Sequence, residues 1–450
     1  MTKARAIDIS DLSEADLIRW FASREVAVIL ESQTPVGPHS RYTILAIDPL
    51  VRFRVQNGAS ILTTPADEQV ITDRNPWDVL AQLITDHSPA MASDLPLSGG
   101  WLGYVGYEAY RYLQDSPVPA YPSSLPDIHL MLFGTLVIMD RLTGTKTQLQ
   151  RDTDFPLRVL SANTLSSVAP PSFKVTSTPE ASMSKEAYLE TVVAAKAAIA
   201  AGNLYQANVA IPFSCRYTGD TSALFHRLRD VSPVPYAAYV KWGSDAVISA
   251  SPEQFLNLNN GHLQTRPIKG TAPRHSDPHQ DSALKDQLLQ SEKDNAELVM
   301  IVDLMRNDFS RVCVPGTVTV PAIKTVESFA QVHHLVGTVE GKLQPGLSPI
   351  DVMKATFPCG SITGAPKISA MRHIYHWENQ ARGPFCGAIG LIGYPPQLNL
   401  NVAIRTAYTH GDTLYFWAGS GIVADSDPES EYDEILAKAS GMRHALAEFE

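Results

Sequence analysis

The chain has 450 residues, of which 44% are hydrophobic and 18% are charged, and its formal net charge is −11. This composition is that of a globular protein and excludes a disordered or collagen-like chain. The acidic balance argues against nucleic acid as a partner, because general nucleic-acid binders are usually basic. The longest nearly continuous apolar run, residues 130–139, is too short to cross a bilayer, and no signal peptide is visible. We therefore expect a cytoplasmic protein that does not associate with membranes.

The length predicts two or three domains, or one large one. Residues 161–184 are rich in Ser, Thr, Pro and Ala and carry almost no charge, which indicates a linker or a long surface connection. This segment separates an N-terminal region, 1–160, from a C-terminal region, 185–450, although the two regions could pack as one unit.

The N-terminal region is predicted to consist of short strands and turns. The apolar patterns indicate strands at 27–31, 41–46, 51–55 and 130–139, with a helix at 76–86 between them. Residues 98–113 alternate glycine with aromatic residues, which suits backbone that packs closely beside rings.

The C-terminal region alternates helices and strands. Residues 204–213 form an alternating strand that places Gln206 and Asn208 on the face opposite to Tyr205 and the apolar residues. The further elements that the patterns predict are helices at 184–201, 291–307, from 348, from 366 and from 428, and strands at 236–242, 246–251, 263–268, 332–336, 387–393, 402–408 and 413–418. The mixture predicts an α+β fold with large, mainly antiparallel sheets.

The four cysteines do not form a metal or redox motif. They lie at positions 215, 313, 359 and 386, and the smallest separation between two of them is 27 residues. We expect reduced, mostly buried thiols.

The first segment that could carry out chemistry is 265–271, TRPIKGT. Proline and glycine fix the backbone around Lys269 at a strand end and present its side chain. A desolvated lysine can lose its proton near neutral pH and act as a nucleophile. The alternative is a surface lysine at a strand exit.

The second segment is 357–367, FPCGSITGAPK, with Pro366 at the expected first position of a helix. Glycines, hydroxyls and free backbone N–H groups at a helix N-terminus suit a carboxylate or a phosphate. The alternative is an ordinary glycine-rich helix cap.

The third feature is two pairs of carboxylates, each three residues apart on a predicted helix. Asp294 and Glu297 form one pair, and Glu431 and Glu434 form the other. Carboxylates from two helices that meet at a cleft suit Mg²⁺, which takes few protein ligands together with water and substrate oxygens. The alternative is a solvated face with a Glu434–Lys438 ion pair.

Seven motifs in this order resemble the chorismate-utilising enzymes. They span 185–441 and read SPEQFL, RPIKGTAPR, AELVMIVDLMRND, VHHLVGTVEG, FPCGSITGAPKISAM, AIRTA and AGSGIVADSDPESEYDEILAK. The resemblance implies an α+β fold like that of anthranilate synthase component I, with two large sheets packed as a sandwich and helices outside.

Two positions distinguish branches within this family. Gln206 stands where isochorismate and salicylate synthases carry a lysine that activates water, which favours ammonia as the nucleophile. Lys269, in PIKGT, stands where the corresponding PIAGT motif of anthranilate synthases has alanine, and a lysine here is typical of aminodeoxychorismate synthase component I. The resemblance thus implies a transaminase-type transferase that makes 4-amino-4-deoxychorismate for 4-aminobenzoate and folate synthesis. Its substrates would be chorismate and ammonia, with the ammonia supplied by a glutamine amidotransferase subunit.

Two alternatives stay open: anthranilate synthase component I, and a catalytically silent tryptophan-binding regulatory protein. The retained Glu253, Lys269, Glu297 and Glu434 count against the silent protein.

The resemblance also implies residue roles. Lys269 would attack C2 of chorismate, Glu253 would protonate the departing C4 hydroxyl, and His334 would lie beside the ring. Glu297 and Glu434 would hold Mg²⁺. The implied substrate-binding residues are Gly270, Thr271, Thr363, Gly364, Arg405, Gly419, Gly421 and Lys438.

The segments 29–32, 39–42 and 233–236 resemble a tryptophan pocket of the ammonia-using branches. The implied residues for L-tryptophan are Ser32, His39, Ser40, Arg41, Tyr42, Pro235, Tyr236 and Ala237. The chain departs from the family pattern at Cys359, Ser420, Ile435 and Phe309-Ser310, which leaves every proposed catalytic group in place.

Overall fold

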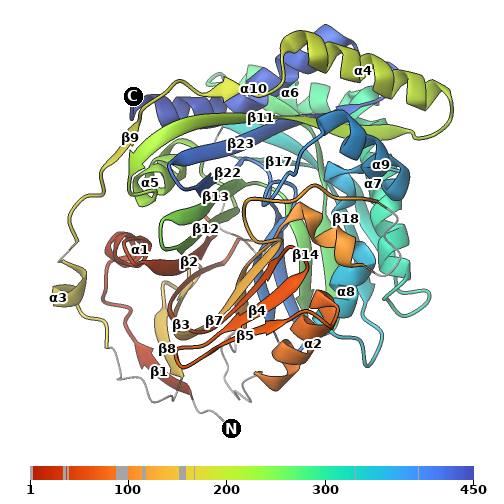
Figure 1. The fold of residues 1–450 in the computed structure, drawn as a ribbon. Helices are drawn as coiled ribbons and strands as arrows, with labels where there is room; N and C mark the ends of the chain where they lie inside the picture. The colour runs from red at the N-terminus through yellow and green to blue at the C-terminus, as the bar shows by residue number, and fades with distance from the viewer. Residues whose placement is uncertain are drawn as a thin grey trace.

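The computed structural model describes residues 4–450 except 34–36, 38–39, 88–99, 114–117, 152–158, 167, 330 and 394. It has an α+β fold in which every described strand pairing is antiparallel, with helices packed outside the strands (Figure 1). The fold class predicted from the sequence is therefore confirmed.

The strands of the described residues form one hydrogen-bonded network. They are β1 (Ala4–Asp8), β2 (Val26–Glu31), β3 (Tyr42–Gln56), β4 (Ala59–Thr63), β5 (Glu68–Ile71), β6 (Trp101–Val105), β7 (Ile128–Asp140), β8 (Lys146–Arg151), β9 (Phe173–Val175), β10 (Glu180–Ala181), β11 (Gln206–Gly219), β12 (Tyr236–Trp242), β13 (Asp245–Ser251), β14 (Gln254–Asn259), β15 (His262–Arg266), β16 (Ile268–Pro273), β17 (Thr319–Ser328), β18 (Val332–Lys342), β19 (Gly364–Ala365), β20 (Ala388–Gly393), β21 (Gln397–Val402), β22 (Thr406–His410) and β23 (Thr413–Ile422).

The helices lie between these strands in the sequence. They are α1 (Glu14–Ala22), α2 (Pro76–Asp86), α3 (Ala162–Leu165), α4 (Lys185–Ala200), α5 (Ser222–Val231), α6 (Pro278–Gln290), α7 (Glu292–Ser310), α8 (Pro349–Thr356), α9 (Lys367–Glu378) and α10 (Pro428–Ala447), with the short 3₁₀ helices η1 (Tyr107–Tyr112) and η2 (Gly360–Ile362).

The N-terminal and C-terminal regions share sheets and a core. Strand β2 pairs with β12, and β6 pairs with β20, so hydrogen bonds cross between the two regions at two places. One apolar cluster contains both Phe53 from β3 and Phe255 from β14, each fully buried. Within residues 161–184, β9 and β10 both pair with β11.

A second apolar cluster lies under another set of helices. It joins α1, α4, α5 and α10 to the sheet through Leu17, Tyr188, Leu224 and Ile435. Figure 1 shows α4 and α10 side by side above β11 and β23, whereas α2, α7 and α8 contribute to the first cluster. Burial of these apolar faces is what holds the helices on the sheet.

The sequence analysis did not predict helices α1, α3, α5 and α6, and two of these, α1 and α6, show what it missed. Helix α1 begins after Ser13, whose hydroxyl accepts a hydrogen bond from the N–H of Asp16. Helix α6 begins after Asp277, which caps the N–H of His279, with Pro278 in the first turn. Both starts carry ordinary N-cap signals, so the sequence did contain the information.

Four local predictions were wrong. The strands predicted at 41–46 and 51–55 are parts of the single strand β3. The strand predicted at 402–408 is broken between β21 and β22, because Arg405 has a left-handed φ of 50° that no strand residue adopts. Tyr205 lies just before β11 and is 67% exposed, so it does not share the buried face of that strand. Pro366 is the N-cap of α9, and Lys367 is the first helical residue.

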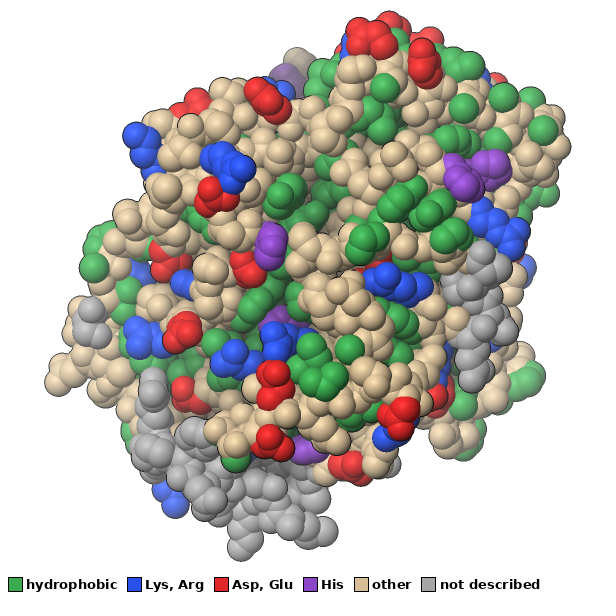
Figure 2. Space-filling model, viewed as in Figure 1, with side chains coloured by type: hydrophobic (Ala, Val, Ile, Leu, Met, Phe, Trp, Pro, Cys, Tyr) green, Lys and Arg blue, Asp and Glu red, His purple; other side chains and the backbone are tan. Residues whose placement is uncertain are grey.

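Two other sequence predictions, on the cysteines and on the segment 98–113, are confirmed. The cysteines at 215, 313, 359 and 386 are free and buried. The part of the 98–113 segment that the structure describes packs closely, since a Cβ on Gly103 would lie 2.1 Å from the His129 carbonyl oxygen. In the described part of the chain, no helix is long and apolar enough to span a membrane. Acidic and basic side chains are interspersed on the face drawn in Figure 2.

Candidate active site

The site is built on the first residues of β11, which pair with β23. Asn208 lies opposite Gly421, and Ala210 lies opposite Gly419. A Cβ on Gly419 would lie 2.6 Å from the Asn208 side-chain oxygen, and a Cβ on Gly421 would lie 2.4 Å from Nε2 of Gln206. The two glycines therefore make room for the side chains of Gln206 and Asn208. Each of these side chains has a buried oxygen that forms no hydrogen bond with a described protein group.

The glycine-rich loop 359–366 closes one side of the site. Gly364 pairs with Ala207 in the short strand β19, at a positive φ of 142°, and its Cβ would lie 2.1 Å from the Gln206 carbonyl oxygen. Only glycine permits this close approach. Thr363 is fully buried, and its hydroxyl donates to carbonyls inside the loop, at 3.1 Å to that of Cys359. The hydroxyl of Thr363 thus stabilises the loop, and its predicted contact with substrate stays a prediction.

Lys269 lies on β16 beside a bulge. The register of β16 against β18 shifts between Lys269 and Thr271, and Gly270 between them has a φ of +69°. The bulge turns the lysine toward the glycine-rich loop, where its Nζ donates to the carbonyl of Ser361 at 3.1 Å. The structure therefore places Lys269 at the site, as the sequence predicts.

Glu253 lies next to this lysine and is 3% exposed. Burial raises the pKa of its carboxyl to about 7, and a hydrogen bond with Ser361 and the charge of Lys269 oppose the rise. Its Oε1 has no hydrogen-bond partner among the described residues. A carboxyl that keeps its proton near neutral pH is suited to act as a general acid.

His334 and Arg405 face the same region. Thr271 and His334 share a hydrogen bond of 2.9 Å between Oγ1 and Nδ1. Burial, and next the charge of Arg405, lower the pKa of His334 to about 3, so the ring is neutral. Arg405 is accessible to solvent, yet burial among surrounding groups lowers its pKa.

Two carboxylates from different helices meet beside Gln206. Burial raises the pKa of Glu297 on α7, Lys269 and Lys293 oppose the rise, and Asp294 and Glu434 add to it. Nε2 of Gln206 donates to Glu297 at 3.5 Å. The negative charge of Glu434 acts on Glu297, so α7 and α10 bring these two carboxylates near each other.

Glu434 on α10 is held by a lysine of the same helix. Burial raises its pKa, but the charge of Lys438 and hydrogen bonds from Lys438 and Ser420 outweigh this effect, so the pKa lies below its usual range. The Nζ of Lys438 lies 2.7 Å from Glu434 and 3.1 Å from the Gly419 carbonyl.

The carboxylates fit a weakly ligated hard cation. Among the described residues, no three His, Cys, Asp or Glu side chains cluster to form a complete metal cage. Mg²⁺ does not need one, because it binds through one or two carboxylates, waters and substrate oxygens. Glu297 and Glu434, coupled as like charges, are such a pair, and a cation between them would relieve their repulsion.

Some residues of the site were not predicted. Ser361 contacts both Lys269 and Glu253, and only its place in the glycine-rich segment hinted at this role. Glu431 is 2% exposed and accepts hydrogen bonds from Ser420 and, at 2.6 Å, from Ser426. The hydroxyl at position 420, where the family pattern has glycine, therefore has a partner in this chain.

The other departures from the family pattern are accommodated locally. Cys359 is buried, with its Sγ 3.3 Å from the Ser361 hydroxyl oxygen. Ile435 and Phe309 are fully buried, each in one of the two apolar clusters.

The residues expected to bind tryptophan gather at one end of β2, β3 and β12. Ala237 pairs with Glu31, and the backbone of Gln33 bonds to Val234. Val234, Ala237 and Ala250 form a small apolar cluster of their own. The members predicted for this pocket that the structure describes are Ser32, Ser40, Arg41, Tyr42, Pro235, Tyr236 and Ala237, whereas His39 lies outside the described residues.

Two charged groups near this pocket already have partners. Arg41 forms a two-point ion pair with Asp140, with its Nη2 at 2.6 Å. Glu31 is likewise held by Arg229 at 2.6 and 2.7 Å. The carbonyls of Ser32 and Gln33 at this strand end also accept hydrogen bonds, from Nη1 of Arg141.

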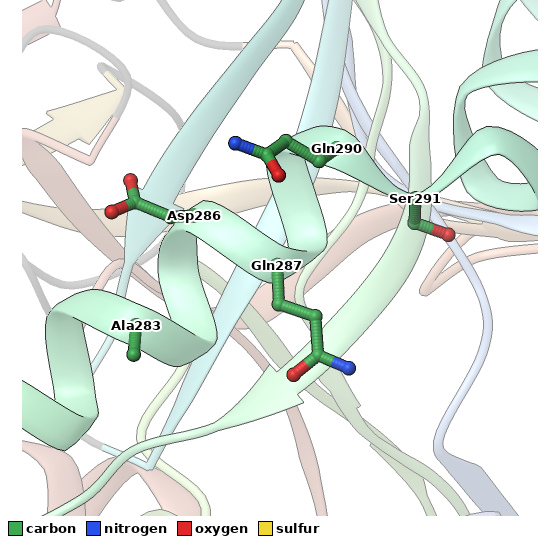
Figure 3. Close-up of a pocket in the computed structure, with 5 residues that line it drawn as sticks. All are labelled: Ala283, Asp286, Gln287, Gln290 and Ser291. Atoms are coloured by element: carbon green, nitrogen blue, oxygen red, sulfur yellow. The ribbon is translucent and has the colours of Figure 1, made fainter.

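A pocket of about 580 Å³ lies elsewhere, along α6 (Figure 3). Its lining is Ala283, Asp286, Gln287, Gln290 and Ser291, which come from one helix and its end. None of the predicted catalytic, metal or substrate residues lines it, although α6 packs on β16, where a Cβ on Gly270 would lie 2.9 Å from the Leu288 side chain.

The fold and this arrangement define a chorismate-binding enzyme. A family model described as "chorismate binding enzyme" matches residues 25–444, and the chain belongs to that family. It is 37% identical to aminodeoxychorismate synthase component 1 of Salmonella typhimurium over 93% of each chain. It is also 34% identical to anthranilate synthase component 1 of Thermus thermophilus, over 94% of this chain and 92% of that one.

A solved structure shares the fold. The crystal structure of anthranilate synthase component I from Streptococcus pneumoniae superposes with a TM-score of 0.76 at 31% identity, over 91% of this chain and 93% of that one.

Proposed function

We propose that this chain converts chorismate and ammonia to 4-amino-4-deoxychorismate. Relatives with 36–37% identity are named aminodeoxychorismate synthase component 1, which indicates this reaction for them. The observation that carries the proposal is Lys269, whose amine lies at the Ser361 carbonyl beside the buried, proton-holding Glu253. A nucleophile and an acid side by side are what a substitution with loss of a hydroxyl requires.

The proposed reaction has two displacements. After its ammonium group has given up a proton, Lys269 attacks C2 of chorismate, the ring double bonds shift, and the C4 hydroxyl leaves as water with the proton of Glu253. Ammonia then forms a bond to C4, the double bonds shift back, and the lysine amine leaves C2. The sum is chorismate plus ammonia giving 4-amino-4-deoxychorismate plus water.

The charges of the site support a dianionic substrate. Arg405, Lys438 and the backbone of the glycine-rich loop are available for the two carboxylates of chorismate. Glu297 and Glu434 would hold a Mg²⁺ ion, which supplies a positive charge opposite a substrate carboxylate when it is bound. These assignments are the ones that the family resemblance implies for these positions.

Two further parts of the proposal concern partners. The words "component 1" in the relatives' name support a separate subunit that supplies ammonia, which we take to be a glutamine amidotransferase in the cytoplasm. The product would serve 4-aminobenzoate and folate synthesis. The small apolar cluster at Ala237 supports L-tryptophan as a second bound ligand.

Product identification tests the proposal. The purified chain is incubated with chorismate, an ammonium salt and Mg²⁺, and the products are separated and identified by mass spectrometry. We expect 4-amino-4-deoxychorismate, which keeps the enolpyruvyl group. Anthranilate with released pyruvate would instead identify an anthranilate synthase, and no turnover would identify a silent binding protein.

A further inference from the structure

Arg382 is a buried arginine outside the predicted site. It lies in the connection between α9 and β20, and its side chain is 1% exposed. Nε and Nη2 donate to the two carboxylate oxygens of Glu378 at 2.8 and 2.6 Å. The remaining donors go to two backbone carbonyls, with Nη1 at 3.0 Å from that of Ile362 and Nη2 at 2.8 Å from that of Asn208.

These two carbonyls lie on the two sides of the seam where the glycine-rich loop meets β11. Ile362 is the loop residue before Thr363, and Asn208 is the strand residue whose side-chain oxygen faces Gly419. The seam also contains the hydrogen bond from the Asn208 N–H to the Thr363 carbonyl, at 2.8 Å. The guanidinium of Arg382 therefore fastens the loop to the strand directly behind the site.

The Glu378 carboxylate extends the same attachment. Its Oε1 also accepts the N–H of Ala210 at 2.9 Å, two residues further along β11. Arginine suits this position because its planar fork presents donors in fixed directions to a carboxylate and to carbonyls together. The shorter set of donors on a lysine ammonium cannot reach all of these acceptors in one plane.

The N-terminal region holds this arginine in place. Both oxygens of the buried Glu108, on η1, accept backbone N–H groups, at 2.8 Å from Arg382 and 2.9 Å from Gly383. The N–H of Tyr107 donates to the Gly383 carbonyl at 2.8 Å, and the Tyr107 ring lies 4.7 Å from the guanidinium carbon. Segment 107–108 is thus directly bonded to the residue that fastens the loop.

The geometry points to Arg382 as a positioning residue for substrate: it sets the place of the loop 359–366 against β11 and is itself held by Glu108. It touches neither the reacting lysine nor the predicted substrate groups and acts through the carbonyls of Ile362 and Asn208. The inference rests on chorismate binding by this family and not on which product the chain forms.

The experiment compares Arg382→Ala and Arg382→Lys with the wild-type chain. Chorismate affinity is measured by calorimetry with Mg²⁺ present, and kcat/KM is measured with chorismate and ammonium. We expect a loss in kcat/KM of about 100-fold for Arg382→Ala, the scale on which a 1 Å misplacement acts. We expect Arg382→Lys to stay folded and to bind chorismate about 10-fold more weakly, which is about 1.4 kcal/mol.

A matched control separates positioning from general loss of stability. Lys241→Met removes another buried cation, the partner of Asp220, from the opposite end of β11. We expect it to lower the melting temperature while chorismate affinity stays within threefold. Millimolar methylguanidinium, below denaturing concentrations, should restore part of the activity of Arg382→Ala and none in the control.

Three results would overturn the inference. The first is a folded Arg382→Ala chain with wild-type affinity and kcat/KM. The second is an equal loss of affinity in Lys241→Met. The third, which decides the matter if Arg382→Ala does not fold, is an Arg382→Lys chain that binds chorismate as the wild type does. A wild-type chain that binds chorismate but makes another product contradicts the proposed function only.

Discussion

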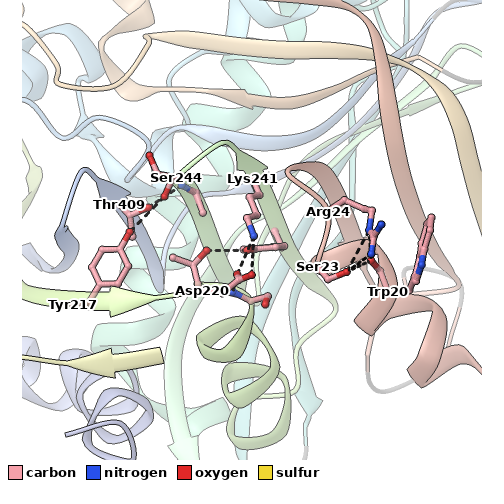
Figure 4. A network of polar contacts seen from close by, with 12 residues as sticks. Trp20, Ser23, Arg24, Tyr217, Asp220, Lys241, Ser244 and Thr409 are labelled. Atoms are coloured by element: carbon pink, nitrogen blue, oxygen red, sulfur yellow. Dashed lines mark hydrogen bonds and ion pairs between the residues drawn. The ribbon is translucent and has the colours of Figure 1, made fainter. Parts of the chain in front are cut away.

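Strand β11 carries a polar cluster at each end, and the two clusters differ in how their atoms are satisfied. At the far end, Lys241 donates to both oxygens of Asp220 at 2.9 and 3.1 Å, and the Asp220 carboxylate also accepts the N–H of Ser222 (Figure 4). At the near end, Gln206, Asn208 and Glu253 each have a buried oxygen without a partner in the described chain.

The difference separates structural from functional polar groups. A buried polar atom without a partner is costly, so a cluster that bonds within itself is what the fold alone would produce. We propose that a bound molecule completes the hydrogen bonds of the acceptors near Lys269, although other buried groups of the described chain, such as both ring nitrogens of His129, also have no partner there. Chorismate, ammonia and water are what the proposed reaction would bring there.

The largest expected effect comes from removing Lys269. We expect Lys269→Ala to lower 4-amino-4-deoxychorismate formation by on the order of 10³-fold, because the nucleophile is gone. Slow direct amination at C2 should then appear as anthranilate and pyruvate, which mass spectrometry and fluorescence detect. The exposed Lys285→Ala on α6 is the control. A wild-type rate in the Lys269 variant would exclude a covalent role.

The second effect concerns the proton on Glu253. We expect Glu253→Gln to lower kcat by about 10²–10⁴-fold, the usual contribution of a general acid. In the wild type, kcat should fall as pH rises through about 7, because Glu253 then loses its proton. The residual activity of the Gln variant should not show this fall of kcat with rising pH. If the Gln variant kept the same fall of kcat with pH, another group would be responsible for it.

The same carboxyl links pH to stability. Its pKa rises from 4.5 in the unfolded chain to about 7 in the folded one, so its stabilising effect is fully present below pH 4.5 and is lost as pH rises to about 7. The slope is at most about 1.4 kcal/mol per pH unit. Glu108, also raised to about 7 by burial, contributes in the same window. Denaturant unfolding between pH 5 and 8 should show a shallower decline for Glu253→Gln.

The third effect tests the carboxylate pair at the near end. We expect Glu297→Gln or Glu434→Gln to raise the Mg²⁺ concentration for half-maximal activity by about 10-fold, because each removes one of few anionic ligands. Calorimetric titration with Mg²⁺ gives a readout independent of turnover. Glu292→Gln, an exposed residue of α7, is the matched control. Equal Mg²⁺ affinity in all three variants would identify Glu297 and Glu434 as ordinary surface carboxylates.

The fourth effect belongs to the far end. Lys241→Met leaves the half-buried Asp220 without its cation, and we expect a loss of about 1–3 kcal/mol in unfolding free energy. The kcat should stay within threefold of the wild type at a temperature where the variant is folded. Denaturant titration and steady-state kinetics measure the two quantities. A large loss of kcat would show that the two ends of β11 are not independent.

The smallest effect is the binding of tryptophan at the β2–β12 edge. A ligand that binds only the folded chain raises the melting temperature as its concentration rises. With millimolar L-tryptophan, on protein stripped of ligand by unfolding and refolding, we expect a rise of about 2–4 °C, since about 1 kcal/mol has that effect in large domains. No shift, together with no tryptophan released from purified protein, would show that these residues are plain core.

The sequence by itself determined the α+β class, the helices α2, α4, α7, α8, α9 and α10, and the segments that carry the candidate site. Helix caps, strand alternation and glycine positions are local signals, and the ordered motifs from SPEQFL to the last helix name the family. The structure brings Lys269, Glu253, Glu297 and Glu434 near one another, although more than 180 residues separate Glu253 from Glu434, and their roles stay predictions.

The tertiary structure decided what depends on contacts between distant segments. The left-handed Arg405 interrupts an apolar pattern that looks like a strand, and only its packing sets that φ. The role of Ser361 depends on a carbonyl that meets Lys269 92 residues away. Arg382 gave no sequence signal, because a buried arginine is recognised by its acceptors, and those come from the loop, from β11 and from helix α9. Burial, likewise, is what raises the pKa of Glu253, and burial is a property of the folded chain alone.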